Sequence, residues 1–181
     1  MALTENALPF GLRQVVLTKI NEDGTLGDKV RLPASRTFSF SEAEDFEELR
    51  GDDRLITVRG QGPSVNWELE AGGISLAAYQ VIAGGTITDG GTTPETTRTF
   101  RKGGYDQRPF FRVEGRAISD SGGDVHCVLH RCRATEDISG EFTDGEFFLT
   151  NAEGQALPDE ANDNILYEFI QNEQETEITL V

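Results

Sequence analysis

The stretch that decides the fold is ITVRGQGPSVNWELEAGGISLAAYQVI, residues 56–82. Its middle part, residues 65–71, alternates between apolar and polar side chains. Such alternation is typical of a β-strand that packs on one face and is solvated on the other. The packed face would hold Val65, Trp67 and Leu69, and the solvated face Asn66, Glu68 and Glu70. We expect the packed face to lie against the following helix or against an opposing sheet.

The same stretch runs into the clearest helix signal of the chain, ISLAAYQVIA at residues 74–83. Ile74, Ala77, Ala78 and Val81 follow the spacing of a buried helix face. Paired glycines flank this segment, and Gly84 can end the helix because glycine readily adopts a left-handed conformation. The sequence therefore predicts a helix directly after the alternating strand.

Most other segments carry strand signals. Residues 10–20 and 30–40 flank an Asp23-Gly24 turn and predict a hairpin, with Pro33 at an edge or bulge of its second strand. The turn sequence DSGG predicts another hairpin between residues 109–119 and 124–134. Further strands are expected at residues 147–149, 165–171 and 175–180.

Three segments are expected to consist mainly of loops and turns. Residues 41–61 predict a long acidic loop, in which SEAEDFEELRGDDR carries seven acidic residues. Within it, residues 55–59 resume a strand, and GQGP at residues 60–63 interrupts the strand signal. Ser41 and Glu44 could also form a capping box, so a short helix over residues 41–54 stays open. Residues 86–97 predict a flexible surface loop and residues 152–164 a turn-rich span.

One helix among seven or eight strands predicts the fold class. We expect a mainly β fold, a β-sandwich or barrel with one flanking α-helix at residues 74–83. No internal repeat or linker is evident, so residues 1–181 are expected to form one domain.

Composition excludes several classes of protein. The chain has 181 residues and a formal net charge of −16. Such acidity argues against ordinary binding of nucleic-acid phosphates, which needs Lys and Arg to replace counterions. No apolar run approaches the ~18 residues of a membrane span, and the N-terminus lacks the basic start and apolar stretch of a secretory signal. Two cysteines fit a reducing compartment.

The charges are unevenly distributed along the chain. Residues 98–133 hold eight basic and four acidic groups, whereas residues 134–181 hold thirteen carboxylates and no Lys, Arg or His. Surfaces of unlike charge favour head-to-tail association of copies into rings or stacks. A solvated surface that is merely patchy is the alternative interpretation.

The segment DVHCVLHRCR, residues 124–133, gathers two histidines and two cysteines. On a helix, His126 and His130 could share a metal ion. The alternation favours a strand, on which these two residues lie about 13 Å apart. Cys127 and Cys132 would then point to opposite faces, which disfavours a disulfide. We expect ordinary strand residues here.

Signals of catalysis are weak. Carboxylate pairs such as Glu42 with Glu44 arise by chance in a chain with 32 acidic residues. Nucleophile elbows, phosphate-binding glycine loops and zinc-protease helices do not occur in the sequence. The acid-rich turns at residues 21–28 and 159–163 lack the spacing of an EF-hand loop. We expect neither an enzyme nor a cofactor.

Taken in order, these segments resemble the major tail tube proteins of long-tailed, non-contractile (siphovirus-type) bacteriophages. The likeness rests on the N-terminal hairpin, SEAEDFEELRGDDRLITVRGQG, the strand VNWELEAGG and the helix ISLAAYQVIAGG. The likeness also includes two later segments, RPFFRVEGRAISDSGGDVHCVLHRCRA and EFTDGEFFLTNAEGQAL. The likeness spans nearly the whole chain as an arrangement of loose patterns and weakens after Ala134.

The resemblance implies a structural virion protein of the tail, assembled in the host cytoplasm. Its copies would form stacked hexameric rings, a tube through which DNA is ejected without being bound. Implied partners are other copies and the tape measure, terminator and distal tail proteins, with no membrane. Two alternatives stay open: a related ring or tube protein of a contractile injection system or a tail terminator, and a monomeric β-sandwich binding module.

The resemblance also assigns surfaces. The strand before the helix would line the channel, with Asn66, Glu68 and Glu70 facing the lumen and repelling DNA phosphates. The loop at residues 41–61 would contact the neighbouring ring, and residues 134–181 would decorate the outside of the same domain. Acids of residues 41–61 would meet an arginine-rich loop of another subunit. The residues assigned to this contact are Glu42, Glu44, Asp45, Glu47, Glu48, Asp52, Asp53, Arg98, Arg101, Lys102 and Arg108.

Overall fold

The alternating segments of the sequence pair into one large antiparallel sheet. The computed structural model describes residues 5–180. Its strands are β1 (Pro9–Ile20), β2 (Leu26–Arg31), β3 (Ser35–Gly51), β4 (Arg54–Gly72), β5 (Thr86–Gly90), β6 (Thr97–Arg101), β7 (Phe111–Ser119), β8 (Asp124–Ala134), β9 (Ser139–Gly140), β10 (Leu149–Leu157) and β11 (Tyr167–Asn172). The helix α1 spans Leu76–Ala83. The predicted mainly β fold with one flanking helix is confirmed.

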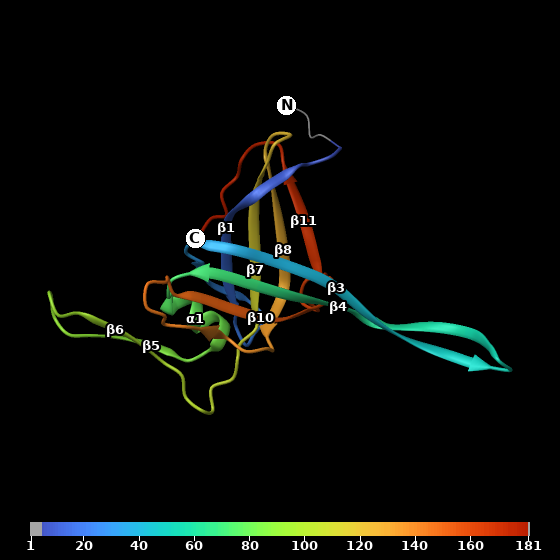
Figure 1. The fold of residues 1–181 in the computed structure, drawn as a ribbon, viewed down its shortest axis with the longest axis horizontal. Helices are drawn as coiled ribbons and strands as arrows, with labels where there is room; N and C mark the ends of the chain where they lie inside the picture. The colour runs from blue at the N-terminus through green and yellow to red at the C-terminus, as the bar shows by residue number, and fades with distance from the viewer. Residues whose placement is uncertain (1–4, 181) are drawn as a thin grey trace.

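The large sheet folds into two layers. Its strand order is β2-β1-β7-β8-β10-β4-β3, and β11 also pairs with β8. β8 joins the layers because residues 124–129 pair with β11 and residues 131–134 pair with β10. Figure 1 shows β3, β4 and β10 crossing over β1, β7 and β8. This arrangement is a β-sandwich whose two layers cross steeply.

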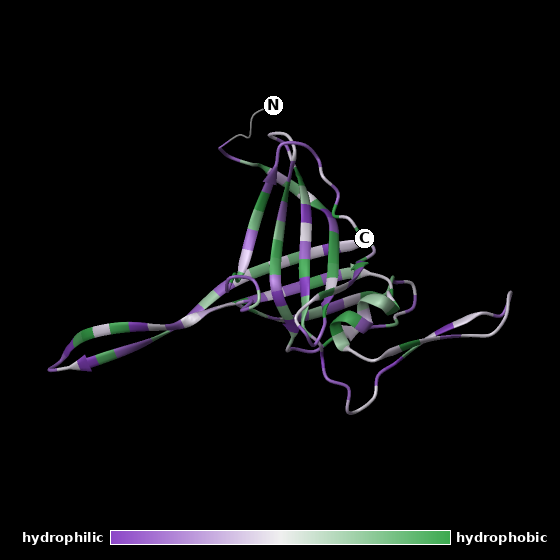
Figure 2. Cartoon of the chain, turned by 180° about the vertical axis from the view of Figure 1, so that it is seen from behind, coloured by the Kyte–Doolittle hydropathy of each residue, from purple (hydrophilic) through white to green (hydrophobic). Residues whose placement is uncertain are grey.

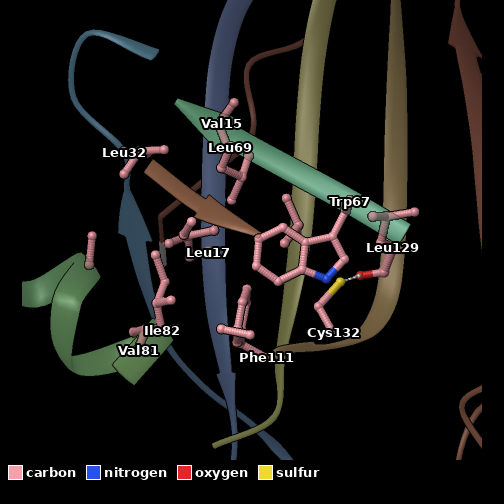
Figure 3. Close-up of a cluster of buried hydrophobic side chains, with 14 of the residues drawn as sticks. Val15, Leu17, Leu32, Trp67, Leu69, Val81, Ile82, Phe111, Leu129 and Cys132 are labelled. Atoms are coloured by element: carbon pink, nitrogen blue, oxygen red, sulfur yellow. Dashed lines mark hydrogen bonds between the residues drawn. The ribbon is translucent and has the colours of Figure 1, made fainter. Parts of the chain in front are cut away.

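The core lies between these layers. Val65, Trp67 and Leu69 of β4 are at most 3% exposed and point at the opposing layer. The Trp67 indole meets the Phe111 ring of β7 edge-on at 5.5 Å between centroids, as Figure 3 shows. Leu17 of β1 belongs to the same cluster. The predicted packing of this strand against an opposing sheet is confirmed.

α1 closes one end of the sandwich. The Ser75 hydroxyl accepts a hydrogen bond from the Ala78 backbone N–H, which makes Ser75 the N-cap. Gly84 ends the helix at φ 76, and a Cβ there would lie 2.4 Å from the Gln107 carbonyl oxygen. The helix begins two residues later than predicted, and Ile74 is exposed instead of buried.

Both predicted hairpins form. β1 pairs with β2, and β7 pairs with β8. The second strand of the first hairpin is shorter than predicted. Pro33 lacks the N–H that a ladder needs, and Ala34 adopts φ 46, so the chain turns there and residues 30–40 are divided between β2 and β3.

The C-terminal third is part of the sheet and not a decoration of its surface. β10 lies between β8 and β4 and is flanked by both. Residues 152–157 were expected to be turn-rich, but they are strand residues, and Gly154 among them leaves room for Trp67. A Cβ at Gly154 would lie 2.7 Å from the Trp67 ring. The strand expected at residues 175–180 is absent, since these residues join no ladder.

Candidate functional site

The segment at residues 41–61 is not a loop or a helix but most of a long β-hairpin. β3 and β4 stay paired from Glu44 opposite Pro63 to Gly51 opposite Arg54. Asp52 and Asp53 form the tip with positive φ at both positions, as a two-residue hairpin turn requires. GQGP at residues 60–63 does not interrupt the strand. We call residues 44–63 the arm.

The arm projects from the sandwich (Figure 1). It carries apolar side chains that are exposed to solvent. Phe46, Leu49 and Ile56 are each more than half exposed, and Leu55 and Val58 are 47% exposed. Figure 2 shows apolar and polar residues mixed along it. Exposed apolar residues on a surface extension are characteristic of an interaction site.

Most acids assigned to inter-ring contact lie on this arm. Glu44, Asp45, Glu47, Asp52 and Asp53 are exposed on it. Glu48 lies 2.8 Å from the Arg50 guanidinium of the same strand. Glu42 precedes the arm, and its Oε2 accepts a hydrogen bond of 2.9 Å from the Tyr167 hydroxyl. The structure therefore places the acidic set on one projecting hairpin with a polar anchor at its base.

The arginine-rich residues are not gathered on one loop. Residues 86–101 form a second projecting hairpin, β5 with β6, instead of the predicted loop at 86–97. Arg98 and Arg101 lie on β6. The Arg98 guanidinium donates to both Asp89 carboxylate oxygens, at 2.6 and 2.8 Å, and this lowers the pKa of Asp89.

Lys102 and Arg108 are engaged by backbone oxygens. The Lys102 ammonium donates to the carbonyls of Ala83 and Asp106. The Arg108 guanidinium donates to the carbonyls of Ala134 and Glu136, at 3.1 and 2.5 Å. Of the four assigned cations, Arg101 is the one whose side chain forms no hydrogen bond or ion pair within the described residues. Their contact with acids of a neighbouring subunit stays a prediction.

The residues assigned to the channel lie on one hydrophilic sheet face. Asn66 and Glu68 are exposed on the outer face of β4, and Glu70 is half-buried there. The neighbouring strands β3 and β10 add further polar side chains to this face. The residues that pair with Asn66, Glu68 and Glu70 are Thr37, Ser39, Ser41, Asn151, Glu153 and Gln155. We call this surface the polar face.

The polar face carries an unfavourable pair of charges. Glu68 of β4 lies directly opposite Glu153 of β10. Like charges at directly opposed positions destabilise a sheet. The one cation paired to this face in the described residues is Arg36, whose Nε lies 3.3 Å from Glu70. Neutral residues would be more stable at these positions, so a role outside the subunit would explain the acids.

A charged network lies on the outer face of the other layer. Asp124 is fully buried, and Arg116, 6% exposed, donates from Nε to its Oδ2 at 2.5 Å. Asn172 Nδ2 and the Thr176 backbone N–H also donate to Asp124, at 2.8 and 2.7 Å. Burial would raise the pKa of Asp124, but these hydrogen bonds outweigh it and hold the pKa below the usual value.

Residues 173–180, which we call the strap, cover this network. The Gln14 side chain brackets Ile178, donating to its carbonyl at 2.9 Å and accepting from its N–H at 3.2 Å. His126 Nε2 lies 3.0 Å from the Thr176 carbonyl and therefore carries the proton. The strap is thus held mainly by polar contacts. The sequence suggested a strand here because Thr176, Ile178 and Leu180 alternate with polar residues.

The histidines and cysteines of β8 behave as expected for a strand. Cys127 and Cys132 are free, and burial raises the pKa of Cys127 to about 12. Burial, reinforced by the nearby Arg112, lowers the pKa of His130. Within residues 5–180, no group of three or more His, Cys, Asp or Glu side chains could hold a metal ion.

The comparisons add no identity to this geometry. No helix of residues 5–180 is long and apolar enough to cross a bilayer. The chain matched no protein-family model, and a search of curated proteins found no similar sequence. Three features of the molecule bear on its function: the arm, the polar face and the network covered by the strap.

Proposed function

We propose that this chain is the subunit of a self-assembling tube of the phage tail type. In this proposal copies form hexameric rings, the rings stack, and the tube conducts DNA during ejection. The observation that carries the proposal is the arm, a projecting hairpin whose apolar side chains are about half exposed or more. Such a surface supports association, and association with further copies of the chain would cover it.

The sheet edges support assembly into rings. β2 and β3 end the strand order of the large sheet, so each leaves one edge without a ladder partner in the described residues. Open edges invite pairing with further strands, and closing them between subunits removes this hazard. Head-to-tail contacts that close by rotation produce rings, and those that do not close produce stacks.

The polar face supports a role as the channel wall. Its glutamates stand opposite one another at a cost to the subunit, and repeated around a ring they would create a strongly negative lumen. DNA phosphates would be repelled from such a wall and could slide without adhering. We therefore propose that Asn66, Glu68 and Glu70 face the lumen, together with Glu153.

Imaging of the purified chain tests the proposal. We expect concentration-dependent sedimentation and, in negative stain, hollow tubes of indefinite length. Isolated rings without tubes would favour a terminator-like protein. A chain that sediments as a monomer at all concentrations would contradict assembly and favour the binding module.

Changing Glu68 and Glu70 to Lys tests the channel wall. We expect tubes to form, because both side chains lie outside the core, but to bind DNA, because phosphates meet rings of cations. A gel-shift assay on assembled tubes should show binding that falls steeply with salt, whereas unmodified tubes bind none. Ejection by a phage carrying the double variant should be impaired. Tubes that exclude DNA after this change would contradict the assignment.

A further inference from the structure

A broad cleft lies outside the arm, and no residue of the arm lines it. It encloses about 1210 Å³ and is lined by the β1–β2 turn, the end of α1, the segment before β7 and the end of β8. This volume exceeds the ~300–1,000 Å³ of usual small-molecule sites. An occupant on the scale of a polypeptide hairpin is therefore indicated.

The wall of the cleft presents cations that lack carboxylate partners. Arg131 and Arg133 point the same way from β8, and their guanidinium carbons lie 4.4 and 5.0 Å from the centre of the Phe110 ring. This stacking holds both groups in place. Lys19 joins them, and none of the three forms an ion pair within the described residues. Their charges are positioned for a partner outside this chain.

The cleft also contains acids, but most are occupied. Asp23 accepts hydrogen bonds from Thr25, and Asp106 Oδ2 accepts one from the Gly103 backbone N–H at 2.6 Å. Asp159 likewise accepts from the Ala161 backbone N–H. Exposed Glu22 and Glu160 remain at the margin. The cleft thus has half-buried Arg131 and Arg133 and exposed Lys19 on its strands, whereas its acids, which stay charged when they accept hydrogen bonds, lie on the turns and loops and can face Arg54 and Arg59 of an incoming arm.

The arm has the matching chemistry. Asp45 and Glu47 are exposed and have no cationic partner within the described residues, and Arg54 and Arg59 likewise lack carboxylate partners. Its exposed apolar side chains could contact Phe110 and the apolar wall near Ile20. Because the arm continues the ladder of β3 and β4 and points away from the body (Figure 1), it cannot fold back into its own cleft.

We propose that the cleft receives the arm of a second copy of this chain, with Arg131 and Arg133 facing the carboxylates of that arm. The proposal rests on the assembly proposed above and names its acceptor surface. Since arm and cleft are different surfaces of one subunit, the contact is head-to-tail and propagates along a stack.

A charge-exchange experiment tests this pairing. The cleft variant is Arg131→Glu with Arg133→Glu, and the arm variant is Asp45→Lys with Glu47→Lys. We expect each variant alone to associate at least about tenfold more weakly in sedimentation velocity, because two contacts become repulsive. A 1:1 mixture of the two should regain most of the association, since each arm then finds a cleft of opposite charge. Tubes should reappear in negative stain.

The controls separate the outcomes. Arg13→Glu reverses the charge of an exposed residue that lies outside the cleft, the arm and the edge strands, and this variant should assemble normally. Thermal unfolding shows whether Arg131 and Arg133 are also needed for folding, in which case Arg131→Gln with Arg133→Gln replaces the reversal. A wild type that never associates overturns both proposals. Normal assembly of both reversals, or no recovery on mixing, overturns the cleft assignment alone. The cleft assignment would also be overturned if the wild type bound an oligonucleotide and the cleft variant lost this binding while its assembly was unchanged.

Discussion

Removal of the arm is expected to leave a folded monomer that no longer stacks. Ala43 pairs with Ser64 at the base of the arm, so residues 44–63 can be replaced by Asn-Gly, a two-residue turn that suits this position. The arm contributes no residue to the buried core, and the free energy of unfolding should change by about 1 kcal/mol or less. Tube formation should be abolished, because the exposed apolar surface of the arm is gone.

Circular dichroism, thermal unfolding and negative stain together check this result. The matched control removes the other projecting hairpin, with residues 88–99 replaced by Asn-Gly between the paired Ile87 and Phe100. If stacking depends on the arm specifically, the control should stack better than the arm deletion. Tubes of normal length from the arm deletion would contradict the proposed role.

The second large effect is expected at Asp124. Asp124→Ala leaves the Arg116 guanidinium buried without its carboxylate and removes the acceptor of Asn172 and Thr176. Removing one partner of a buried ion pair costs about 3–5 kcal/mol. Arg116→Met with Asp124→Leu removes both charges and should cost clearly less. Equal losses in the two variants would contradict the ion-pair explanation.

The same carboxylate predicts a dependence on pH. The folded state holds the pKa of Asp124 below its unfolded value of about 4, so its contribution to stability is complete above that value and is lost as the pH falls through the folded pKa. Arg116, His126 and Glu175 face the same network. Urea unfolding between pH 5 and pH 3 should show a shallower loss of stability in Asp124→Ala than in the wild type.

The sequence was sufficient to predict strands that have one buried face and one solvated face. Trp67 and Glu68 lie on opposite faces of one strand, and that contrast produces the alternation that reveals it. The arm escaped notice because both of its faces are solvated, so no period of two appears around Phe46 and Leu49. At residues 86–97, two glycines and Pro94 suggested a loop, although the threonines of β5 and β6 favour a strand.

The candidate site was predictable only in part. The acids of the arm and the polar face follow from local sequence. The cleft does not, since Lys19, Phe110 and Arg133 come from three distant segments that only the sheet order brings together. Likewise, Gly154 suggested a turn, because the local sequence does not show that the Trp67 ring packs against this position.

The position of β10 in the sheet sets the earliest moment at which the layer that carries the arm can be completed during synthesis. β4, which carries one strand of the arm, has β3 as its only neighbour until residues 149–157 leave the ribosome and pair with it. Contacts between such distant segments form slowly, and incomplete sheets are prone to aggregate. The arm can therefore form early as a local hairpin, whereas the layer that supports it is completed late. In the assembly proposed above, a ribosome-bound fragment that ends before Leu149 would lack β10 and could not enter a growing stack.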